Sequence, residues 1–325
     1  MVRAPILVTG GAGYIGSHAV LALLEKGEEV VVLDNLSTGE KSRIPAGVFL
    51  ARGDVGDRDM VRGLLAKYGF EAILHFAGVV KVEESMREPE RYRRINVEET
   101  KVLADEARAA RVPYFLFSSS ASVYGNPQHI PISEDAPLSP ISPYAETKRD
   151  AEEALRMIFS DAVHYSFMRY FNVAGVDPDG RSGYSTKEKP THLIRSAVRA
   201  AVREEEFTIN GNDYPTPDGT CIRDYIHVSD LVDAHLAVLE HLRAGGVSRV
   251  FNCGTGRGYS NAEVLKSVER IAGSPMRVRI GPRRPGDPAA TVADTERISR
   301  EIGWKPRFGL DDMIRHELSW TRAHL

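Results

Sequence analysis

Short apolar runs and helix-spaced apolar residues alternate along the first half of the chain. The runs contain many β-branched side chains and end near glycine, serine or aspartate. Such runs predict buried strands, whereas stretches in which apolar residues recur every three or four positions predict helices. The predicted strands are 6–9, 29–34, 48–52, 72–78 and 114–117. Because strands and helices alternate, we expect a parallel sheet with helices on both faces.

The second half of the chain departs from this alternation. The predicted helices are 17–24, 57–68, 90–110, 142–155, 191–204 and 228–243, and a further strand is predicted at 250–254. Residues 210–219 are dense in glycine, proline, asparagine and aspartate, which indicates a long turn-rich segment. A segment of this kind is usually functional in a compact protein.

These elements predict an α/β protein with two lobes. We expect a doubly wound parallel Rossmann sheet in residues 1–175, to which residues 228–254 return. Residues 176–227 and 255–325 are expected to form a smaller C-terminal α/β lobe that binds the substrate. The two predicted lobes therefore interleave in sequence.

The first predicted strand runs into a glycine-dense loop that opens the first helix, Gly10–Gly16 with the sequence GGAGYIG. Its glycines fit two dinucleotide-binding spacings, one starting at Gly10 and one at Gly11, and both include Gly13. Glycine permits the sharp turn, the approach of a pyrophosphate to the backbone, and close packing of the helix on its strand. The motif alone is equally a feature of some ordinary strand-to-helix turns.

An acidic residue at the end of the second strand favours NAD as the cofactor. Asp34 lies where this fold hydrogen-bonds the adenosine ribose, and a carboxylate there repels the 2′-phosphate of NADP. No arginine directly follows it. The polar loop that begins at Asn35 suits the adenosine half of the cofactor. Asp54, after the third strand, either meets the adenine amino group or caps a surface helix.

Composition narrows the function classes. The chain has 325 residues, 42% of them hydrophobic, and a formal net charge of -3. It is therefore expected to be globular, without the basic surface that nucleic acid requires. Arg283 and Arg284 form one local cationic spot, which suits a solvated turn as well as a binding site.

The cysteines and the apolar runs bear on the compartment. Cys221 and Cys253 lack metal-ligand spacing and are expected to be reduced packing residues, and no metal site is predicted. No apolar run reaches the roughly 18 residues of a membrane span, and we expect no leader segment before the first strand. These features favour a cytoplasmic protein with no membrane partner.

Residues with catalytic chemistry follow the fifth strand and open the next helix. The serines 118–120 stand at the carboxyl end of the strand, where ligands of open α/β sheets lie. Tyr144 and Lys148 share one face of the predicted helix, so the ammonium can stabilise a phenolate. The ordinary pKa of tyrosine is about 10, and this support is needed for it to act as a base near neutral pH. Each feature is common alone, but their combination with the glycine loop is specific.

Together these motifs resemble the extended short-chain dehydrogenase/reductase family, most closely its UDP-sugar 4-epimerases. The resemblance covers essentially the whole chain. The segments that carry it are 10–16, 75–78, 118–125, 144–148, 170–172, 211–214, 223–228 and 284–287.

The resemblance implies a role for individual residues. It implies that Tyr144 is the catalytic base, that Lys148 supports it and holds the nicotinamide ribose, and that Ser120 binds the hydroxyl at the reacting carbon. The implied cofactor-binding residues are Gly10, Gly13, Tyr14, Ile15, Gly16, Asp34, Asn35, Asp54, Val55, Phe76, Ala77, Gly78, Asn96, Ser118, Tyr144, Lys148 and Tyr170. The implied substrate-binding residues are Ser120, Tyr144, Asn172, Arg223, Arg284, Asp287 and Thr291. Each of the two arginines also suits a surface ion pair.

The implied reaction is the NAD-dependent interconversion of UDP-glucose and UDP-galactose. Hydride leaves C4 of the sugar as Tyr144 takes the proton of the 4-hydroxyl, the 4-keto sugar turns, and hydride returns to the opposite face. Since NAD is regenerated in each turnover, a tightly held cofactor is expected. The resemblance also implies a homodimer formed through helices 90–110 and 145–159.

Two other functions are compatible with the fold. A sugar-nucleotide dehydratase or decarboxylase of the same family is one, but a dehydratase normally has an Asp-Glu pair where this chain has Ala121 and Ser122. A catalytically silent, NAD-sensing regulatory protein is the other, since a fold alone does not establish chemistry. Such proteins typically lose the Tyr-x-x-x-Lys pair, which this chain retains.

The residue at position 291 bears on the range of sugars. In this family a tyrosine at the matching position narrows the sugar pocket and excludes an N-acetyl group at C2, and here the residue is Thr291. The smaller side chain predicts that UDP-N-acetylglucosamine and UDP-N-acetylgalactosamine are also accepted.

Overall fold

The computed structural model describes residues 4–160, 162–185, 190–284 and 286–325, and these fall into two compact units. The first unit consists of the chain up to Gly125 together with Pro137–Arg169 and Val232–Phe251. The second unit consists of Asn126–Ala136, Tyr170–Leu231 and Asn252–Leu325. These boundaries differ from the predicted lobes chiefly at 126–136, which belongs to the second unit. What each unit binds stays a prediction.

A seven-stranded sheet runs through the first unit in the order β10-β6-β5-β4-β1-β2-β3. Its strands are β1 (Ile6–Thr9), β2 (Val30–Asp34), β3 (Phe49–Arg52), β4 (Ala72–His75), β5 (Tyr114–Ser120), β6 (His164–Tyr170) and β10 (Arg249–Cys253). The pairings of β1 with β2, β1 with β4, β2 with β3 and β4 with β5 are all parallel. The strand order reverses between β1 and β4, which is where such sheets bind ligands.

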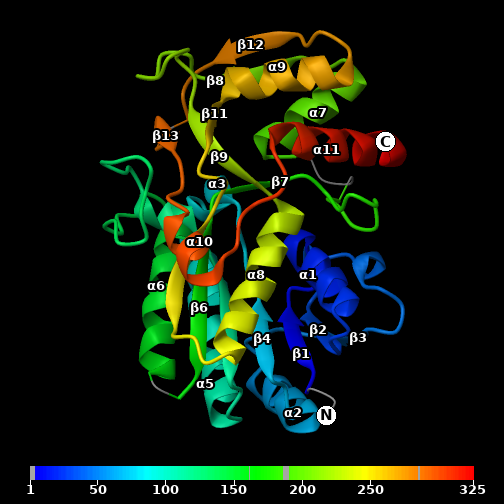
Figure 1. Ribbon diagram of the computed structural model, residues 1–325, viewed down its shortest axis with the longest axis vertical. Coiled ribbons are helices and arrows are strands. Elements are labelled where there is room, and N and C mark those ends of the chain that lie inside the picture. The colour runs from blue at the N-terminus through cyan, green and yellow to red at the C-terminus, as the bar shows by residue number, and fades with distance from the viewer. Residues whose placement is uncertain (1–3, 161, 186–189, 285) are drawn as a thin grey trace. The chain divides into compact units, whose positions relative to one another are not determined.

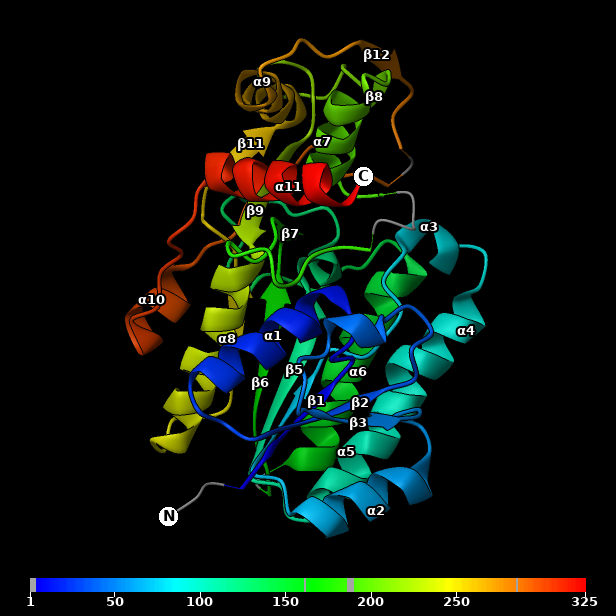
Figure 2. The same cartoon turned by 90° about the vertical axis from the view of Figure 1, so that its right-hand side faces the viewer.

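Helices cover both faces of this sheet (Figures 1 and 2). One face carries α1 (Tyr14–Glu25) and α8 (Val228–Arg243). The other carries α2 (Arg58–Tyr68), α5 (Thr100–Ala109) and α6 (Pro143–Phe159), and α5 packs against both α2 and α6. The predicted doubly wound sheet is thereby confirmed.

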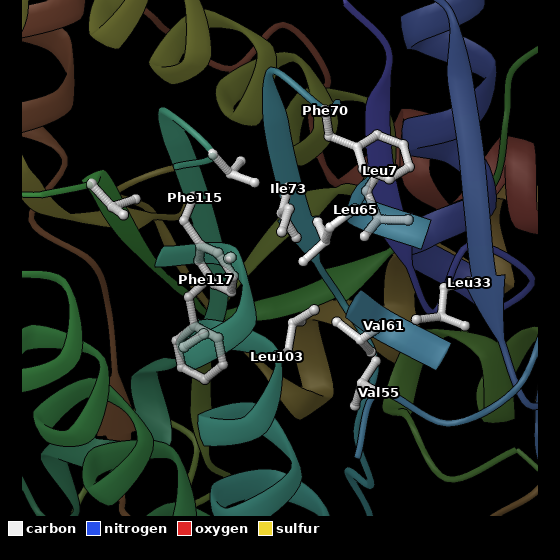
Figure 3. Packing of buried hydrophobic residues seen from close by; sticks show 14 of the residues in the cluster. Leu7, Leu33, Val55, Val61, Leu65, Phe70, Ile73, Leu103, Phe115 and Phe117 are labelled. Atoms are coloured by element: carbon white, nitrogen blue, oxygen red, sulfur yellow. The ribbon is translucent and has the colours of Figure 1, made fainter. Parts of the chain in front are cut away.

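The core under α2 and α5 explains the apolar runs in the sequence. Leu7 is in register with Ile73, and Ile73 is in register with Phe115, so the three side chains point to the same face. Figure 3 shows them beside Leu65 of α2 and Leu103 of α5. The intervening residues of these strands are buried as well, against the other helical layer, so each run is apolar throughout.

The predicted helix 90–110 is helical throughout but not uniform. It consists of α4 (Pro89–Arg93), a π-helical turn over Arg94–Glu99 (η2), and α5. Asn96, in the π-helical turn, is buried, and its side-chain amide forms hydrogen bonds with residues outside this helix. The wider turn accommodates this side chain, and π-helical turns often occur at functional sites.

The fifth strand is longer than predicted. It continues from Tyr114 through Ser118 and Ser119 to Ser120, so the prediction that the strand ends at residue 117 is wrong. Serine has no strong preference for strands, but here the pairing of β5 with its neighbours decides the conformation. The 3₁₀ turn η3 (Ala121–Tyr124) follows, with Ser120 as its cap.

The second unit is built from short strands and three packed helices. The strands and helices are β7 (Asn172–Ala174), α7 (Leu193–Arg203), β8 (Phe207–Asn210), β9 (Ile222–His227), β11 (Gly258–Ser260), α9 (Asn261–Ala272), β12 (Val278–Gly281), β13 (Ala290–Thr291), α10 (Glu296–Ile302) and α11 (Leu310–His324). Strand β9 pairs with β7, β11 and β13, and β8 pairs with β12. Helices α7, α9 and α11 enclose the core of this unit.

The remaining short elements of the first unit are η1 (Lys41–Arg43) and α3 (Val82–Ser85). Among the residues that the structure describes, no helix combines the length and the apolar character that a membrane crossing needs.

Candidate active site

The glycine loop of the first unit is crowded at two positions of the dinucleotide-binding glycine spacing, Gly10 and Gly16. Gly10 has a φ of 70°, and a Cβ there would lie 2.6 Å from the backbone nitrogen of Ala77. A Cβ on Gly16 would lie 2.2 Å from the carbonyl oxygen of Gly10. Larger residues are therefore excluded at both positions, whereas the binding of a cofactor by this loop stays a prediction.

The same loop leaves the positive end of α1 available to an anion. The N-cap of α1 is Gly13, which provides no side-chain cap, and the first turn, which Tyr14 and Ile15 open, has no acidic residue. Backbone N–H groups at a helix N-terminus bind phosphate, and the helix dipole favours negative charge there. The loop therefore fits the pyrophosphate of a dinucleotide.

Asp34 is fixed at the end of β2 by two backbone donors. Its Oδ2 accepts from Ala12 N–H at 2.9 Å, and its Oδ1 accepts from Leu36 N–H at 2.8 Å. Each carboxylate oxygen has a second lone pair, so the group can still accept from ribose hydroxyls. A buried negative charge held in this way fits NAD and disfavours the additional phosphate of NADP.

Asn35 and Asp54 come together beyond the ends of β2 and β3. The Asn35 Nδ2 donates to Asp54 Oδ1 at 3.1 Å. The cap of α2 is Asp57, which accepts from Met60 N–H, so the alternative that Asp54 caps a helix is excluded. Burial raises the pKa of the Glu99 carboxyl, and the neighbouring Asp54 charge raises it further. The contact of Asp54 with the adenine of a cofactor stays a prediction.

Two further predicted cofactor-binding residues, Val55 and Tyr170, also have buried side chains. Val55 packs in the core of the first unit (Figure 3), so only its backbone is left for the predicted cofactor contact, which stays a prediction. Tyr170 is the last residue of β6 and is also buried.

The end of β4 approaches Lys148. A Cβ added to Gly78 would lie 2.9 Å from the Asn96 Oδ1 and 3.9 Å from the Lys148 Nζ, so this turn is small where the lysine passes. The Phe76 ring, two residues earlier, packs against His235 with 5.0 Å between ring centroids. Ala77 and Gly78 therefore give a cofactor ribose close access to the strand end.

Asn96 holds this turn in place. Its Oδ1 accepts from Val79 N–H at 2.9 Å, and its Nδ2 donates to the Val79 carbonyl at 3.0 Å and to Thr147 Oγ1 at 3.1 Å. The amide thereby links the turn after β4 to helix α6. A positioning role accounts for all of these bonds, whereas the predicted direct contact with the cofactor stays a prediction.

The three predicted catalytic side chains come together at the end of β5. Lys148 is buried, and its Nζ donates to the carbonyl of Ser118 at 2.8 Å. Tyr144 lies one helical turn before Lys148 and is partly buried. The Ser120 hydroxyl accepts from the backbone N–H of Ser122 at 3.2 Å and from its hydroxyl at 2.9 Å. Because Ser122 donates to it, Ser120 has its own proton to give to another group.

The burial of these groups sets their protonation. Burial lowers the pKa of Lys148 to about 8, although the Glu152 charge opposes this change. Burial raises the pKa of Tyr144, and the hydrogen bond with Ser120 lowers it. Lys148 is therefore mostly an ammonium at neutral pH, and Tyr144 is a phenol that needs a neighbouring positive charge to ionise.

His75 is a buried histidine near Lys148, and it carries no charge at neutral pH. Its Nδ1 is 2.6 Å from the Thr9 hydroxyl and its Nε2 is 2.9 Å from the Thr100 hydroxyl. Burial, and then the Lys148 charge, lower the pKa of His75 to about 3. The imidazole is thus uncharged at neutral pH and does not compete with Lys148 as a cation.

In the second unit, strand register gathers the predicted substrate-binding residues. Thr291 of β13 is in register with Arg223 of β9, and Asn172 of β7 is in register with Tyr225, two residues further along β9. Residues in register point to the same face, as do residues two apart in one strand. Asn172, Arg223 and Thr291 therefore share one face of this sheet.

Arg223 and Asp287 form an ion pair at this face. The Arg223 Nη2 is 3.2 Å from the Asp287 Oδ1, and the arginine side chain is 13% exposed, against 37% for the aspartate. The Asp287 N–H donates to the Arg284 carbonyl at 3.3 Å, so the backbones of these two residues lie close together. A partly buried arginine is costly to maintain for a surface ion pair alone.

The two neighbouring arginines, 283 and 284, differ in their surroundings. Arg283 pairs with Asp213 at 2.6 Å and lies over the Tyr214 ring at 4.3 Å, so it fastens the turn-rich segment. Arg284 instead acts electrostatically on His192. The cationic spot seen in the sequence is thus divided between a structural residue and a candidate ligand.

His192 is a residue of this region that the sequence did not single out. It is the last residue before α7, and burial, then the charges of Arg195 and Arg284, lower its pKa. The charge of Arg284 thus acts on this histidine and favours its neutral form. Its position directly before an amphipathic helix was the only signal available in the sequence.

Other predicted features are simple to place. Cys221 and Cys253 are both free and buried, in agreement with their expected packing role. Across the described ranges, no cluster of three or more histidine, cysteine or acidic residues is suited to a metal ion.

Comparison with known proteins gives the family of this chain. The sequence profile of the "NAD dependent epimerase/dehydratase family" matches residues 6–254. The UDP-glucose 4-epimerase of Azospirillum brasilense is 45% identical over 321 residues, which are 98% of this chain and 92% of that protein. The enzyme of the same name from Lactobacillus helveticus is 42% identical, with 98% and 97% of the two chains covered.

Solved structures give the same result. The UDP-glucose 4-epimerase from Stenotrophomonas maltophila, with bound NAD and formylated UDP-arabinopyranose, has a TM-score of 0.95 at 36% identity, covering 99% and 98% of the chains. The enzyme from Brucella ovis in complex with NAD has a TM-score of 0.93 at 40% identity, covering 98% of each. The UDP-Glc/GlcNAc 4-epimerase from Campylobacter jejuni has a TM-score of 0.85 at 36% identity, covering 98% and 99%.

Proposed function

The chain belongs to the NAD dependent epimerase/dehydratase family, and we propose that it interconverts UDP-glucose and UDP-galactose at C4 of the sugar. The observation that carries the proposal is the group formed by Tyr144, the buried Lys148 and Ser120 at the end of β5. Relatives of similar length and solved structures of the same fold are UDP-glucose 4-epimerases.

The first unit fits NAD as the cofactor. The crowded glycine loop and the uncapped start of α1 accept a pyrophosphate, and the carboxylate of Asp34 accepts ribose hydroxyls. Held by these residues, NAD would supply the hydride-transfer chemistry at C4 of the sugar. The small residues Ala77 and Gly78 leave space for the nicotinamide ribose beside Lys148.

The chain's own residues manage the proton and the geometry of the sugar. Tyr144 removes the proton of the 4-hydroxyl, and the Lys148 ammonium stabilises the phenolate that this requires. Ser120 donates its proton toward the same oxygen. When the 4-keto sugar has turned, Tyr144 gives the proton back, so the side chains end each cycle as they began.

The second unit is proposed to hold the UDP moiety. Arg223 and Arg284 offer bidentate, charge-assisted bonds to the diphosphate, and Asn172 and Asp287 offer polar contacts to the uridine ribose. These residues do not take part in the chemistry. A firm grip on the nucleotide lets the sugar turn without leaving the enzyme.

The proposal extends to assembly, compartment and substrate range. We propose a cytoplasmic homodimer formed through helices 90–110 and 145–159, which pack together in the first unit and carry Met157 with 83% of its surface exposed. We also propose that Thr291, beside Arg223, leaves space for N-acetylated sugars.

Turnover tests the function directly. Purified protein incubated with UDP-glucose and no added cofactor is expected to form UDP-galactose, because NAD is carried by the protein and regenerated in each cycle. Loss of water from the sugar would instead identify a dehydratase. NAD binding without any product would identify a regulatory protein, and activity only with added NADP would contradict the role of Asp34.

A further inference from the structure

A buried ion pair of the first unit takes no part in the mechanism described above. Glu152 of α6 and Arg169 of β6 are 1% and 2% exposed. The Arg169 Nε is 2.8 Å from the Glu152 Oε1, and its Nη2 is 2.6 Å from the Oε2, so the pair is bidentate. A buried pair of this kind often contributes little net stability, because two charges must leave water. Its place in the fold therefore suggests another role.

Glu152 has a third donor, and this donor connects it to the catalytic group. The Ser119 hydroxyl donates to the Glu152 Oε1 at 2.5 Å. Ser119 lies between Ser118, whose carbonyl accepts from Lys148, and Ser120. Because alternate residues of a strand point to opposite faces, anchoring Ser119 on one side sets the position of Ser120 on the other.

Arg169 extends the same network to the turn after β5. Its Nη1 donates to the Tyr124 hydroxyl at 3.1 Å, and its guanidinium lies over the Tyr124 ring at 5.1 Å. Tyr124 ends η3, the 3₁₀ turn that Ser120 caps. Both ends of the segment from Ser119 to Tyr124 are thus held through one ion pair.

We propose that Glu152 is a positioning residue for the epimerisation, an inference that rests on the proposed function. Through Ser119 it fixes where Ser120 lies relative to Tyr144. Its negative charge also favours the ammonium form of Lys148, one helical turn before it.

The charges around Lys148 give the sign of this effect. Glu152 is the anion that supports the ammonium, Arg169 and Arg156 both pair with Glu152, and His75 is neutral. Without the Glu152 charge, Lys148 loses its proton more readily and supports the Tyr144 phenolate less. A displaced Ser120 also withdraws a hydrogen bond that lowers the pKa of Tyr144. Both changes raise the pKa of Tyr144.

The test is the pH profile of Glu152→Gln, with Glu153→Gln as the matched control. Glu153 is the next residue of the same helix and is exposed. For Glu152→Gln we expect kcat to fall roughly 10- to 100-fold, the order of loss that a small misplacement of reacting groups produces, with KM for UDP-glucose unchanged. The acid limb of the kcat profile should move up by about one pH unit, a tenfold change in the ionised fraction of Tyr144. The control, Glu153→Gln, should match wild type in kcat, in KM for UDP-glucose and in the position of the acid limb.

A second variant separates position from charge. Ser119→Ala removes the hydroxyl that donates to Glu152 and leaves the ion pair intact. We expect a smaller fall in kcat and a smaller shift of the limb in the same direction, with thermal stability close to wild type. Glu152→Gln leaves Arg169 buried without its partner. If that prevents the variant from folding, Ser119→Ala still tests the inference.

The inference and the proposed function fail in different ways. If wild type does not epimerise UDP-sugars, the proposed function is wrong; the network is then tested by the ultraviolet absorbance of the Tyr144 phenolate during a pH titration, with Tyr144→Phe as the blank. If wild type is active but both variants lower kcat without moving the limb or the phenolate titration, Glu152 only stabilises the fold and the inference is overturned.

Discussion

In the first unit, the candidate catalytic residues lie on long regular elements and are close in sequence, whereas the second unit assembles its candidate ligands from short strands far apart in the chain. Tyr144 and Lys148 share a 17-residue helix, and Lys148 bonds to Ser118 across 30 residues. Arg223 and Asp287 are separated by 64 residues, and Thr291 stands on a strand of only two. The proposed chemistry therefore lies on long regular elements, and the proposed substrate contacts lie on short ones.

The contrast predicts two kinds of mutational effect. Changes in the catalytic group of the first unit should lower kcat, because they remove interactions made in the transition state. Changes in the second unit should raise KM or alter the choice of sugar, because the UDP grip is the same before and during the reaction. Each prediction below tests one side of this division.

Tyr144→Phe should have the largest effect. It removes the proposed base and little else, and general base catalysis commonly contributes about 10²- to 10⁴-fold to the rate. We expect a loss of kcat in this range, with NAD content, UDP-glucose binding and thermal stability retained. Activity within a few-fold of wild type would remove Tyr144 from its role and break the first half of the comparison.

Two buried carboxylates sharpen the contrast between the units. Glu152 in the first unit accepts from Ser119 and Arg169, whereas neither side-chain oxygen of Glu317 in the second unit has a hydrogen-bond partner among the described residues. Burial raises the pKa of Glu317 to about 7, although the Arg195 charge opposes this change. Glu317 is therefore protonated in the folded state at a pH where it is ionised in the unfolded chain.

This difference makes stability depend on pH. Because the folded pKa of Glu317 lies above the unfolded value of about 4.3, its contribution is fully present below pH 4 and is lost as pH rises toward 7. The loss is on the order of 3 kcal/mol above pH 7. Glu317→Gln should therefore raise the thermal midpoint at pH 8 and change it little at pH 5. An equal change at both pH values would show that Glu317 is ionised in the fold.

Arg223→Ala tests the second half of the comparison. It removes a partly buried guanidinium from the proposed diphosphate site, and we expect KM for UDP-glucose to rise roughly 10- to 100-fold with kcat within a few-fold, since charge-assisted bonds to phosphate are strong. Arg279→Ala is the matched control, because Arg279 is an exposed arginine of β12 that pairs with Glu206. A fall in kcat with KM unchanged would contradict the division of roles.

The fold was predictable from the sequence where the signal is local. The structure agrees to within one residue or two with the predicted strands 6–9 and 29–34 and the predicted helices 57–68 and 228–243. In these elements the spacing of the apolar residues in the sequence matches the positions that pack into the core. The extension of β5 through Ser118–Ser120 and the π-helical turn at Arg94–Glu99 were not predictable. Both depend on partners distant in sequence, for which propensity gives no information.

The residues of the candidate site were likewise predictable only where the signal is local. Tyr144, Lys148 and the glycine loop follow from spacing within one helix or one turn. The register that brings Thr291 beside Arg223 joins strands that no local pattern relates, and the ion pair of Glu152 with Arg169 joins a helix to a strand. His192 gave no distinctive signal, since Arg284, whose charge acts on it, lies far along the chain. Long-range pairing is what single-sequence reasoning lacks.

Of these variants, Thr291→Tyr should have the smallest effect on the epimerisation of UDP-glucose. Its effect should be confined to N-acetylated sugars. The side chain stands in register with Arg223, so a larger residue there narrows the space next to the proposed diphosphate site. A clash with an added group can exclude a substrate strongly, whereas a pocket discriminates weakly against a missing group. We expect wild type to epimerise UDP-N-acetylglucosamine as well as UDP-glucose, and Thr291→Tyr to lose the first activity while keeping the second within a few-fold.

Thr291→Ser is the control for this last prediction, because it keeps a small hydroxyl side chain at the same position and should retain both activities. Both substrates are compared by resolving the C4 epimers formed by each variant under one set of conditions. Wild type that ignores N-acetylated sugars, or a tyrosine variant that turns them over as fast as wild type, would remove Thr291 from the role of gate. If Thr291→Tyr instead lowered kcat for both sugars equally, the second unit would be shaping the chemical step, and the division between the two units would have to be redrawn.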